Sequence, residues 1–393
     1  MRFVHTSDWH LGRDFGPVSL DADQSEFIDW LFGMCVEREV EMLVIAGDIF
    51  DRAYAPVDAI KQFTDTLLRF NAAEIKVAAI TGNHDGAQRV ANFGRLADAS
   101  HVYVRGEYAA FGEVIRVEFN DGPLDLVLLP FLDPQAAPDR LPTEVDDPSD
   151  DSFARRIRRT HQSVLEAAVA AVQPGLTAPR SLAVSHAFVA GAIESQSERQ
   201  LTIGGSAVVD ARLFEPFSYT ALGHLHRPQD VADTPTIRYS GTPLAYSFSE
   251  EHGKSVTVVD MAVDGACTIE HVPVPVGRAV LSIEGTLDVL LQARPTEAAA
   301  MSLVRATITD PGVVLDAKQK LSAVYPHVVE IVLRPTNADG TPVVDSGAVI
   351  DRHSQSPAEI AEAFWEASVS SAPAGAERAL LHSAIEHAEG KVA

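Results

Sequence analysis

The chain has 393 residues, of which 46% are hydrophobic and 22% are charged, so it is globular in composition and long enough for two or three domains. Its formal net charge of −24 argues against a nucleic-acid partner, unless bound cations neutralise part of it, because non-specific DNA affinity comes from Lys and Arg. There is no apolar run of the ~18–20 residues that a membrane span needs and no signal peptide, and only Cys35 and Cys267 are present, so we expect a cytoplasmic protein with no membrane partner.

The first part of the chain alternates strand and helix patterns, which is typical of an α/β domain. Apolar runs predict buried strands at 3–5, 42–46 and 75–80. Amphipathic patterns predict helices at 24–40, 57–70 and 86–97. Residues 113–119 and 124–129 flank an Asn-Asp-Gly-Pro turn and are predicted to form a hairpin.

A loop rich in Pro and Asp over 130–151 precedes a predicted helix that ends at Val172. Further strands are predicted at 181–187, 219–222, 237–240, 256–259 and 268–272. After a break at 273–277, strands at 280–283, 303–308 and 328–333 predict a small separate α/β domain, and two helices follow residue 356. We therefore expect a first domain over 1–274, a second over 277–336, a linker over 337–355 and C-terminal helices over 356–393.

Seven polar side chains lie at or just after the ends of the predicted strands. They are Asp8, His10, Asp48, Asn83, His186, His224 and His226. Sites in open α/β sheets gather outside the carboxyl ends of the strands, so these residues can converge on one crevice. Carboxylate, amide and imidazole ligands suit Mn²⁺, Fe or Zn²⁺, and two cations about 3.5–4 Å apart would polarise a phosphoryl oxygen and generate hydroxide.

Each of these elements has a simpler explanation when taken alone. A single Asp-x-His is a weak indication of a metal site, a Gly-Asp after a strand is usually a turn, and one histidine such as His186 is more often a core or surface residue. The occurrence of all five clusters in order, each at a strand end, favours a functional dinuclear site.

The series Asp8-x-His10, Gly47-Asp48-x-x-Asp51, Gly82-Asn83-His84-Asp85, His186 and Gly223-His224-x-His226 resembles the calcineurin-like metallophosphoesterases. The flanks at 5–12 and 239–250 resemble the nuclease subunits of bacterial SbcCD complexes. The resemblance is strong over roughly the first 260 residues and rests on layout alone beyond them. It implies a four-layer β-sandwich flanked by helices, with a small α/β capping domain and C-terminal helices.

The resemblance also implies roles for the residues of the site. One cation is held by Asp8, His10, Asp48 and His226, and the other by Asp48, Asn83, His186 and His224. His84 protonates the leaving oxygen or stabilises the transition state, and Asp51 orients His84, although Asp51 could also serve as a helix N-cap. Manganese is the cofactor that the family implies.

The implied activity is Mn²⁺-dependent 3′→5′ exonuclease and endonuclease cleavage of DNA ends, including hairpins. Two alternatives are a small-molecule phosphodiesterase of the same superfamily and a non-catalytic scaffold for an ATPase partner. Arg52 and Arg89 lie near the presumed site in sequence and are candidate phosphate contacts. The basic cluster at 155–159 lies beside an acidic stretch, so we favour local ion pairing over a DNA contact there.

Two surfaces are candidates for protein partners. Apolar faces on the C-terminal helices could dock a partner, which the resemblance implies to be an SbcC-type ATPase, with packing on the capping domain as the alternative. The resemblance also implies a homodimer in which helices 57–70 and 86–97 form a four-helix bundle, with simple packing on the sheet as the alternative.

Overall fold

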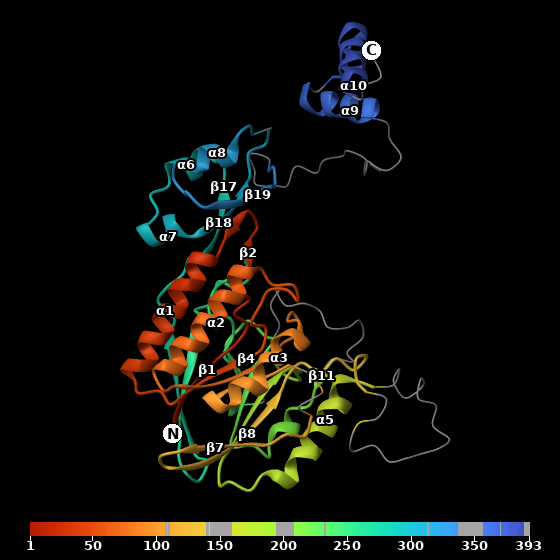
Figure 1. The fold of residues 1–393 in the computed structure, drawn as a ribbon. Coiled ribbons are helices and arrows are strands. Elements are labelled where there is room, and N and C mark those ends of the chain that lie inside the picture. Colours follow the sequence, from red (N-terminus) through yellow and green to blue (C-terminus); the bar gives the residue numbers. More distant parts are fainter. Residues whose placement is uncertain are drawn as a thin grey trace, which may run out of the picture. The chain divides into compact units, whose positions relative to one another are not determined.

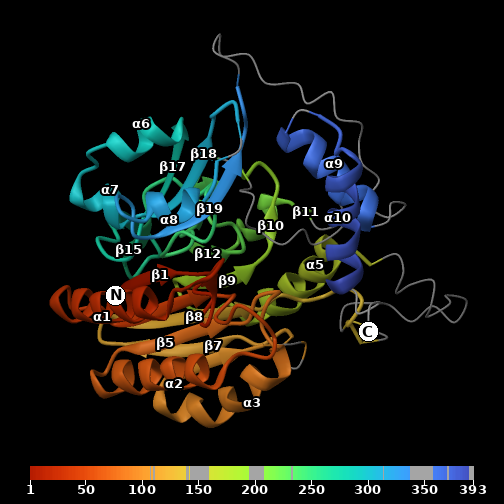
Figure 2. The same cartoon turned by 90° about the horizontal axis from the view of Figure 1, so that it is seen from above.

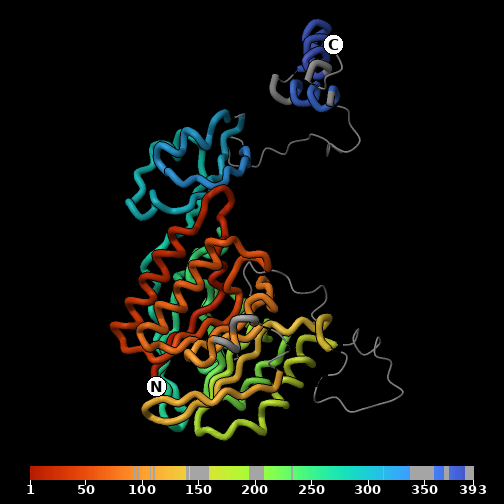
Figure 3. Tube along the Cα trace, viewed as in Figure 1, coloured from red at the N-terminus to blue at the C-terminus, as the bar shows by residue number. Residues whose placement is uncertain are grey.

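The computed structural model describes residues 1–106, 108, 111–138, 141, 159–193, 208–231, 233–312, 314–336, 357–369 and 371–388 (Figure 3). The predicted linker at 337–355, the basic residues 155–158 and the side chains of Phe93 and Leu96 lie outside this description. The chain divides into two compact units. The first contains residues 1–282, 295–305 and 325–330, and the second contains 283–294, 306–324 and 331–393. The domain boundaries expected from the sequence remain a prediction.

The first sheet of the larger unit has the strand order β16-β15-β1-β4-β5-β6. Its strands are β1 (Arg2–Thr6), β4 (Met42–Ala46), β5 (Lys76–Ile80), β6 (Val102–Arg105), β15 (Ser255–Met261) and β16 (Cys267–Pro273). The four strands from β1 to β6 run parallel, whereas β15 is antiparallel to β1. The apolar runs predicted as buried strands are thus confirmed at the centre of this sheet.

The second sheet has the strand order β13-β14-β12-β9-β8-β7. Its strands are β7 (Ile115–Phe119), β8 (Gly122–Leu129), β9 (Ser181–His186), β12 (Tyr219–Gly223), β13 (Gln229–Val231) and β14 (Thr234–Tyr239). The hairpin predicted from the Asn-Asp-Gly-Pro turn is confirmed as β7 and β8, and β8, β9, β12 and β14 run parallel.

Helices cover the outer faces of the two sheets (Figures 1 and 2). They are α1 (Asp21–Glu37), α2 (Val57–Ala72), α3 (Ala87–Ala97) and α5 (His161–Val172). Residues of α1 and α2 pack on the first sheet, those of α5 pack on the second, and a third apolar cluster that includes Phe3, Met42 and Leu126 fills the space between the sheets. This order of helix, sheet, sheet and helix confirms the predicted four-layer sandwich.

The remaining described elements are short or lie toward the C-terminus. A three-stranded sheet has the order β17-β18-β19, from β17 (Val280–Gly285), β18 (Leu303–Ile308) and β19 (Val328–Leu333). The helices are α6 (Leu287–Gln292), α7 (Glu297–Met301), α8 (Ala317–Leu321), α9 (Pro357–Val369) and α10 (Gly375–Ala388). Within the second unit, Glu362 of α9 pairs with Arg378 and His382 of α10. Among the described residues, no helix is both long and apolar enough to cross a membrane.

Candidate metal centre and active site

The loops that follow the parallel strands of the two sheets meet at one end of the sandwich. The Asp8 main-chain N–H donates to the Gly47 carbonyl at 2.9 Å, which joins the loops after β1 and β4. The Asp8 carboxylate accepts from the His224 main-chain N–H at 3.0 Å, which ties this pair of loops to the one after β12. The strand ends therefore bring candidate ligands from both sheets together. The sequence predicted this convergence of the candidate ligands.

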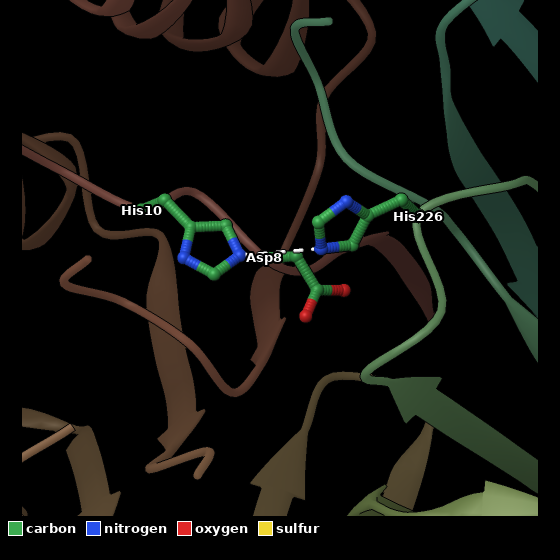
Figure 4. Close-up of side chains that lie close together, drawn as sticks. All are labelled: Asp8, His10 and His226. Carbon is green, nitrogen blue, oxygen red and sulfur yellow. Dashed lines mark hydrogen bonds between the residues drawn. The ribbon is translucent and has the colours of Figure 1, made fainter. Parts of the chain in front are cut away.

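The first group consists of Asp8, His10 and His226, which lie close enough together to bind one cation. The rings of His10 and His226 face each other with 3.3 Å between their Nε2 atoms, and Asp8 lies beside them (Figure 4). Nδ1 of His226 lies 3.0 Å from Oε1 of the buried Glu250. Because a carboxylate only accepts, Nδ1 carries the hydrogen and Nε2 presents a lone pair. Two ring nitrogens held about 2.1 Å from one cation stand roughly 3.0–3.4 Å apart, so the spacing fits a shared cation.

The second group consists of Asn83, His186 and His224. The Asn83 Oδ1 lies 2.9 Å from Nε2 of His186 and 3.2 Å from Nδ1 of His224. Nδ1 of His186 faces the Ala46 carbonyl at 3.0 Å and must donate to it, so a neutral His186 turns a lone pair toward the Asn83 oxygen. Lone pairs that face one another repel unless a positive charge lies between them, and either a proton on Nε2 of His186 or a cation supplies that charge.

Asp48 lies between the two groups. Its Oδ2 is 3.9 Å from Nε2 of His10 and 3.5 Å from Nε2 of His186, so one carboxylate oxygen reaches the ring nitrogens of both. Asp48 and Asp8 are both buried, and in the described part of the chain neither forms a salt bridge with Lys or Arg. Buried carboxylates without such a partner need another source of positive charge. Asp48 is thus within reach of both groups of candidate ligands.

The pKa values of the site reflect its need for positive charge. Burial lowers the pKa of His186, but the nearby Asp48 and Asp8 carboxylates more than offset this and raise it to about 9. Burial raises the pKa of Asp8 to about 6 although His186 opposes the change. The carboxylates therefore attract a proton when no cation is near, and divalent cations would replace that proton.

Backbone strain is concentrated at the candidate ligands. Asp8, His10, Asp48 and His224 have φ values of 54°, 46°, 47° and 105°, which are unfavourable for residues other than glycine. Such conformations cost about 1–3 kcal/mol each and persist where surrounding structure enforces them. The neighbouring Gly223 is required by space, because a Cβ there would lie 1.8 Å from the Ala46 oxygen. The loops are therefore shaped to present the ligand side chains.

His84 lies beside the first group, but it is oriented in a different way from that expected. Its ring makes an edge contact with His10 at a centroid distance of 4.8 Å, and its main-chain N–H donates to Asp48 at 2.8 Å. We expected the Asp51 carboxylate to orient the ring, and this expectation was wrong. Nδ1 of His84 instead contacts the Asp51 main-chain oxygen at 2.8 Å, while the carboxylate pairs with Arg13 at 3.1 Å.

Two buried carboxylates that were not expected to have a role support the site. Asp85 accepts main-chain hydrogen bonds from Ile49, Phe50 and Gly82 at 3.1, 2.8 and 2.9 Å, which links the loops after β4 and β5. Burial raises the pKa of Asp85 to about 7. Glu250 orients His226 as described above. Both residues stand inside the resembling motifs, Asp85 in 82–85 and Glu250 in 239–250, but the motifs do not show what either carboxylate contacts.

The structure does not bring the two candidate arginines into the ligand groups. Arg52 is exposed, and Arg89 lies over the Tyr54 ring with 3.8 Å from its guanidinium carbon to the ring centroid. On α2, Phe63 is buried against the first sheet, whereas Leu68 is 64% exposed. Part of the apolar surface of α2 is therefore buried against the sheet, and part of it is exposed.

The chain is similar in sequence to known protein families and to curated proteins. A family model described as calcineurin-like phosphoesterase matches residues 1–158, and one described as Type 5 capsule protein repressor C-terminal domain matches residues 276–369. The SbcD subunit of the SbcCD nuclease from Bacillus subtilis is 31% identical over 287 residues, which cover 72% of this chain and 71% of that protein. The SbcD protein of Staphylococcus saprophyticus is 29% identical over 334 residues, or 84% of each chain. A dimetal phosphatase structure from Danio rerio aligns with a TM-score of 0.39 at 13% identity, covering 70% of this chain and 96% of that one.

Proposed function

The chain belongs to the SbcD family of nuclease subunits, and from this premise we propose that it cleaves DNA phosphodiester bonds with two divalent cations, specifically Mn²⁺. The observation that carries the proposal is the position of Asp48, whose Oδ2 reaches ring nitrogens of both ligand groups. We assign Asp8, His10, Asp48 and His226 to one cation. We assign Asp48, Asn83, His186 and His224 to the other. The mixed oxygen and nitrogen donors suit Mn²⁺.

When bound, two such cations polarise the phosphoryl oxygens and supply hydroxide as the nucleophile at neutral pH. The chain's own residues orient the ligands and move the proton. Nδ1 of His84 donates to the Asp51 main-chain oxygen, which fixes the ring. As an imidazolium, His84 carries a second proton on Nε2, which it passes to the leaving oxygen. His84 is thus the proposed proton donor, and Asp51 acts through its main chain.

Within this proposal the substrates are DNA ends and hairpins, cut by 3′→5′ exonuclease and endonuclease activity. Family membership supports this substrate class, because the relatives carry the name nuclease. The intact donor set argues against a non-catalytic scaffold. Exposed Arg52 and Arg89 are proposed phosphate contacts at the edge of the site.

We also propose two protein partners. The first is an SbcC-type ATPase that docks on α9 and α10, in keeping with the relationship to SbcD proteins. The second is another copy of this chain that packs on α2 and α3, where Val57 and Leu68 are exposed. The molar mass of the chain in light scattering tests the homodimer. A cytoplasmic location, expected from two unpaired cysteines, remains a prediction.

The test uses the full chain with Mn²⁺, hairpin-ended DNA and the small ester bis(p-nitrophenyl) phosphate. The wild-type chain should cleave both substrates, and His84→Asn should lower kcat about 10²–10⁴-fold while it retains two cations per chain. His101→Asn, at an exposed histidine outside the site, is the control. Cleavage of the ester but of no DNA, with or without the ATPase partner, would indicate a small-molecule phosphodiesterase. A chain that binds no cation would indicate a scaffold.

A further inference from the structure

A basic cavity borders the loop that carries the proposed ligand His226, because the adjacent Arg227 lines it. It has a volume of about 370 Å³ and lies where β13 and β14 of one sheet approach β15 and β16 of the other. Its charged lining residues are Arg227, Arg238 and Asp230, so positive side chains outnumber negative ones. His252 and His271 also line it, and burial lowers the pKa of both, so they are neutral hydrogen-bonding groups. In a chain with a net charge of −24, such a local excess of basic side chains is unusual and attracts anions.

Arg238 is the central side chain of this cavity and is only 3% exposed. Its Nη1 donates to the Asp230 carboxylate and also lies 3.1 Å from Nε2 of His271. Its Nε is buried and has no hydrogen-bond partner in the described part of the chain. A buried donor that lacks an acceptor costs about 1–3 kcal/mol, and more when the group is charged, so the protein satisfies the Arg238 guanidinium only in part.

Ion pairing alone does not account for the cavity. Asp230 satisfies one end of the Arg238 guanidinium but leaves Nε unpaired. Arg227 is exposed on the cavity wall, and among the described residues it forms no salt bridge. A purely structural Arg238–Asp230 pair would require neither the second arginine nor the two histidines. An oxyanion would accept from both arginines at once.

The cavity is connected to the metal centre through a shared loop. Arg227 directly follows the proposed ligand His226, and Nε2 of His252 lies 3.3 Å from the His226 main-chain oxygen. An anion held by Arg227 would thus lie close to a strand whose scissile phosphate is at the cations. Guanidinium groups favour phosphate because their parallel N–H groups match its oxygens.

We propose that this cavity binds a phosphate group, either a backbone phosphate of the DNA strand beyond the scissile bond or a free phosphate ion. The proposal rests on the proposed nuclease function. The cavity compensates locally for the acidity of the chain, and it sets the register of the bound strand through Arg227 and Arg238.

The test measures cleavage kinetics with the full chain and Mn²⁺. Arg227→Gln should raise KM for hairpin DNA about tenfold and leave kcat unchanged, which is the effect of one lost charged hydrogen bond. The slope of log affinity against log salt should fall by about 0.9 for the lost phosphate contact. Hydrolysis of bis(p-nitrophenyl) phosphate should not change. Arg238→Lys retains the charge beside Asp230 but removes the parallel N–H groups of the guanidinium, so it should show the same rise in KM without unfolding the chain.

The matched control is Arg212→Gln, which removes the same charge from an exposed arginine that does not line the cavity. Its KM for DNA should equal that of the wild type. An unchanged KM in both cavity variants excludes a DNA phosphate. Titration of inorganic phosphate into the chain in EDTA then shows whether the cavity binds a free phosphate ion. If it does, the wild type should bind phosphate and Arg227→Gln should not.

The proposal is overturned when neither DNA kinetics nor phosphate binding differs between the wild type and the cavity variants. A failure of the nuclease proposal gives a different result, because the wild type would then cleave no DNA. In that case the phosphate titration in EDTA still reports on the cavity alone.

Discussion

At the scale of single residues, Glu250 lies outside the two ligand groups, yet it determines which nitrogen of His226 can bind a cation. Its Oε1 faces Nδ1 of His226 at 3.0 Å, and its Oε2 accepts from Thr242 at 3.0 Å and from Lys254. Burial would raise the pKa of Glu250, but His226 and Lys254 more than offset this and lower it. Glu250 is therefore ionised and holds His226 in the tautomer that presents Nε2.

Glu250→Gln should lower the affinity of the first cation by about 10–100-fold, because partners of ligand histidines contribute that much to metal binding. The measurement is a Mn²⁺ titration followed by calorimetry. Glu251→Gln changes the adjacent, exposed carboxylate and should bind Mn²⁺ as the wild type does. Equal affinities in the two variants would show that the Glu250 contact does not orient a metal ligand.

The sequence could predict the seven candidate ligands because each stands at or just after a short apolar strand. It could not predict how His84 is oriented, since the oxygen that does so belongs to the main chain of Asp51 and every residue type has such an oxygen. The role of Glu250 depends on a contact with His226 across 24 positions of the chain, and only the fold reveals it. Asp85 likewise acts on main-chain N–H groups, which leave no pattern in the sequence.

His5 provides a test of stability against pH. Both ring nitrogens are buried, at 3.1 Å from the Tyr219 hydroxyl and 3.1 Å from the Leu222 main-chain oxygen. Burial, together with the charge of Arg238, lowers the pKa of His5 to about 3. In the unfolded chain His5 takes up a proton near pH 6.5, whereas in the folded chain it stays neutral down to about pH 3. The contribution of His5 to the free energy of unfolding is therefore fully present above pH 6.5 and is lost as the pH falls toward 3.

Between pH 7.0 and 5.5, the free energy of unfolding of the wild type should therefore fall by about 1 kcal/mol more than that of His5→Gln. Glutamine stays neutral while it can donate to Leu222 and accept from Tyr219. Urea unfolding in EDTA measures the difference without a contribution from proton-linked metal release. His101→Gln, at an exposed histidine, should keep the wild-type slope. If the free energy of unfolding fell equally in all three chains, His5 would not be the source of the pH dependence.

At the scale of elements, continuous apolar runs made the central strands predictable, and the shortest strands escaped prediction. β4 is a five-residue apolar stretch and β5 is apolar after Lys76, and both lie between helices, so their type follows from composition. β6 has four residues and exists because it pairs with β5. β2 (Asp14–Phe15) and β3 (Val18–Ser19) have two residues each and are defined by their contact with one another. Strands of this length depend on a partner rather than on their own sequence.

The C-terminal helices allow a prediction about docking. Leu380 on α10 is 74% exposed. If α10 contacts an SbcC-type ATPase, Leu380→Glu should weaken that complex about tenfold or more, because burial of a leucine contributes roughly 1.5–3 kcal/mol. Affinity for the ATPase partner is measured by calorimetry. Ser383→Glu adds the same charge at an exposed position of α10 and is the control, and both variants should hydrolyse bis(p-nitrophenyl) phosphate normally. Equal binding by the two variants would exclude docking through Leu380.

At the scale of the whole molecule, the balance of 55 acidic against 31 basic side chains opposes the approach of DNA. Two bound divalent cations add about four positive charges at the site itself. The Debye length is about 10 Å at 0.1 M salt, so distant acidic groups are screened there, and the cations and nearby arginines dominate for a strand that is already in contact. Affinity for DNA should therefore depend on the cations to a greater degree than in a basic DNA-binding protein.

The His84→Asn chain, which should retain the cations but not cleave, allows this to be measured with hairpin DNA. Replacing Mn²⁺ by EDTA should lower the affinity about tenfold or more, because the attraction at the site disappears. Lowering the salt to about 0.01 M in EDTA should not restore binding, because the Debye length grows to about 30 Å and the acidic surface then repels the DNA from further away. A basic DNA-binding protein would bind more tightly under those conditions. Strong binding in EDTA at low salt would mean that basic side chains, and not the cations, hold the DNA.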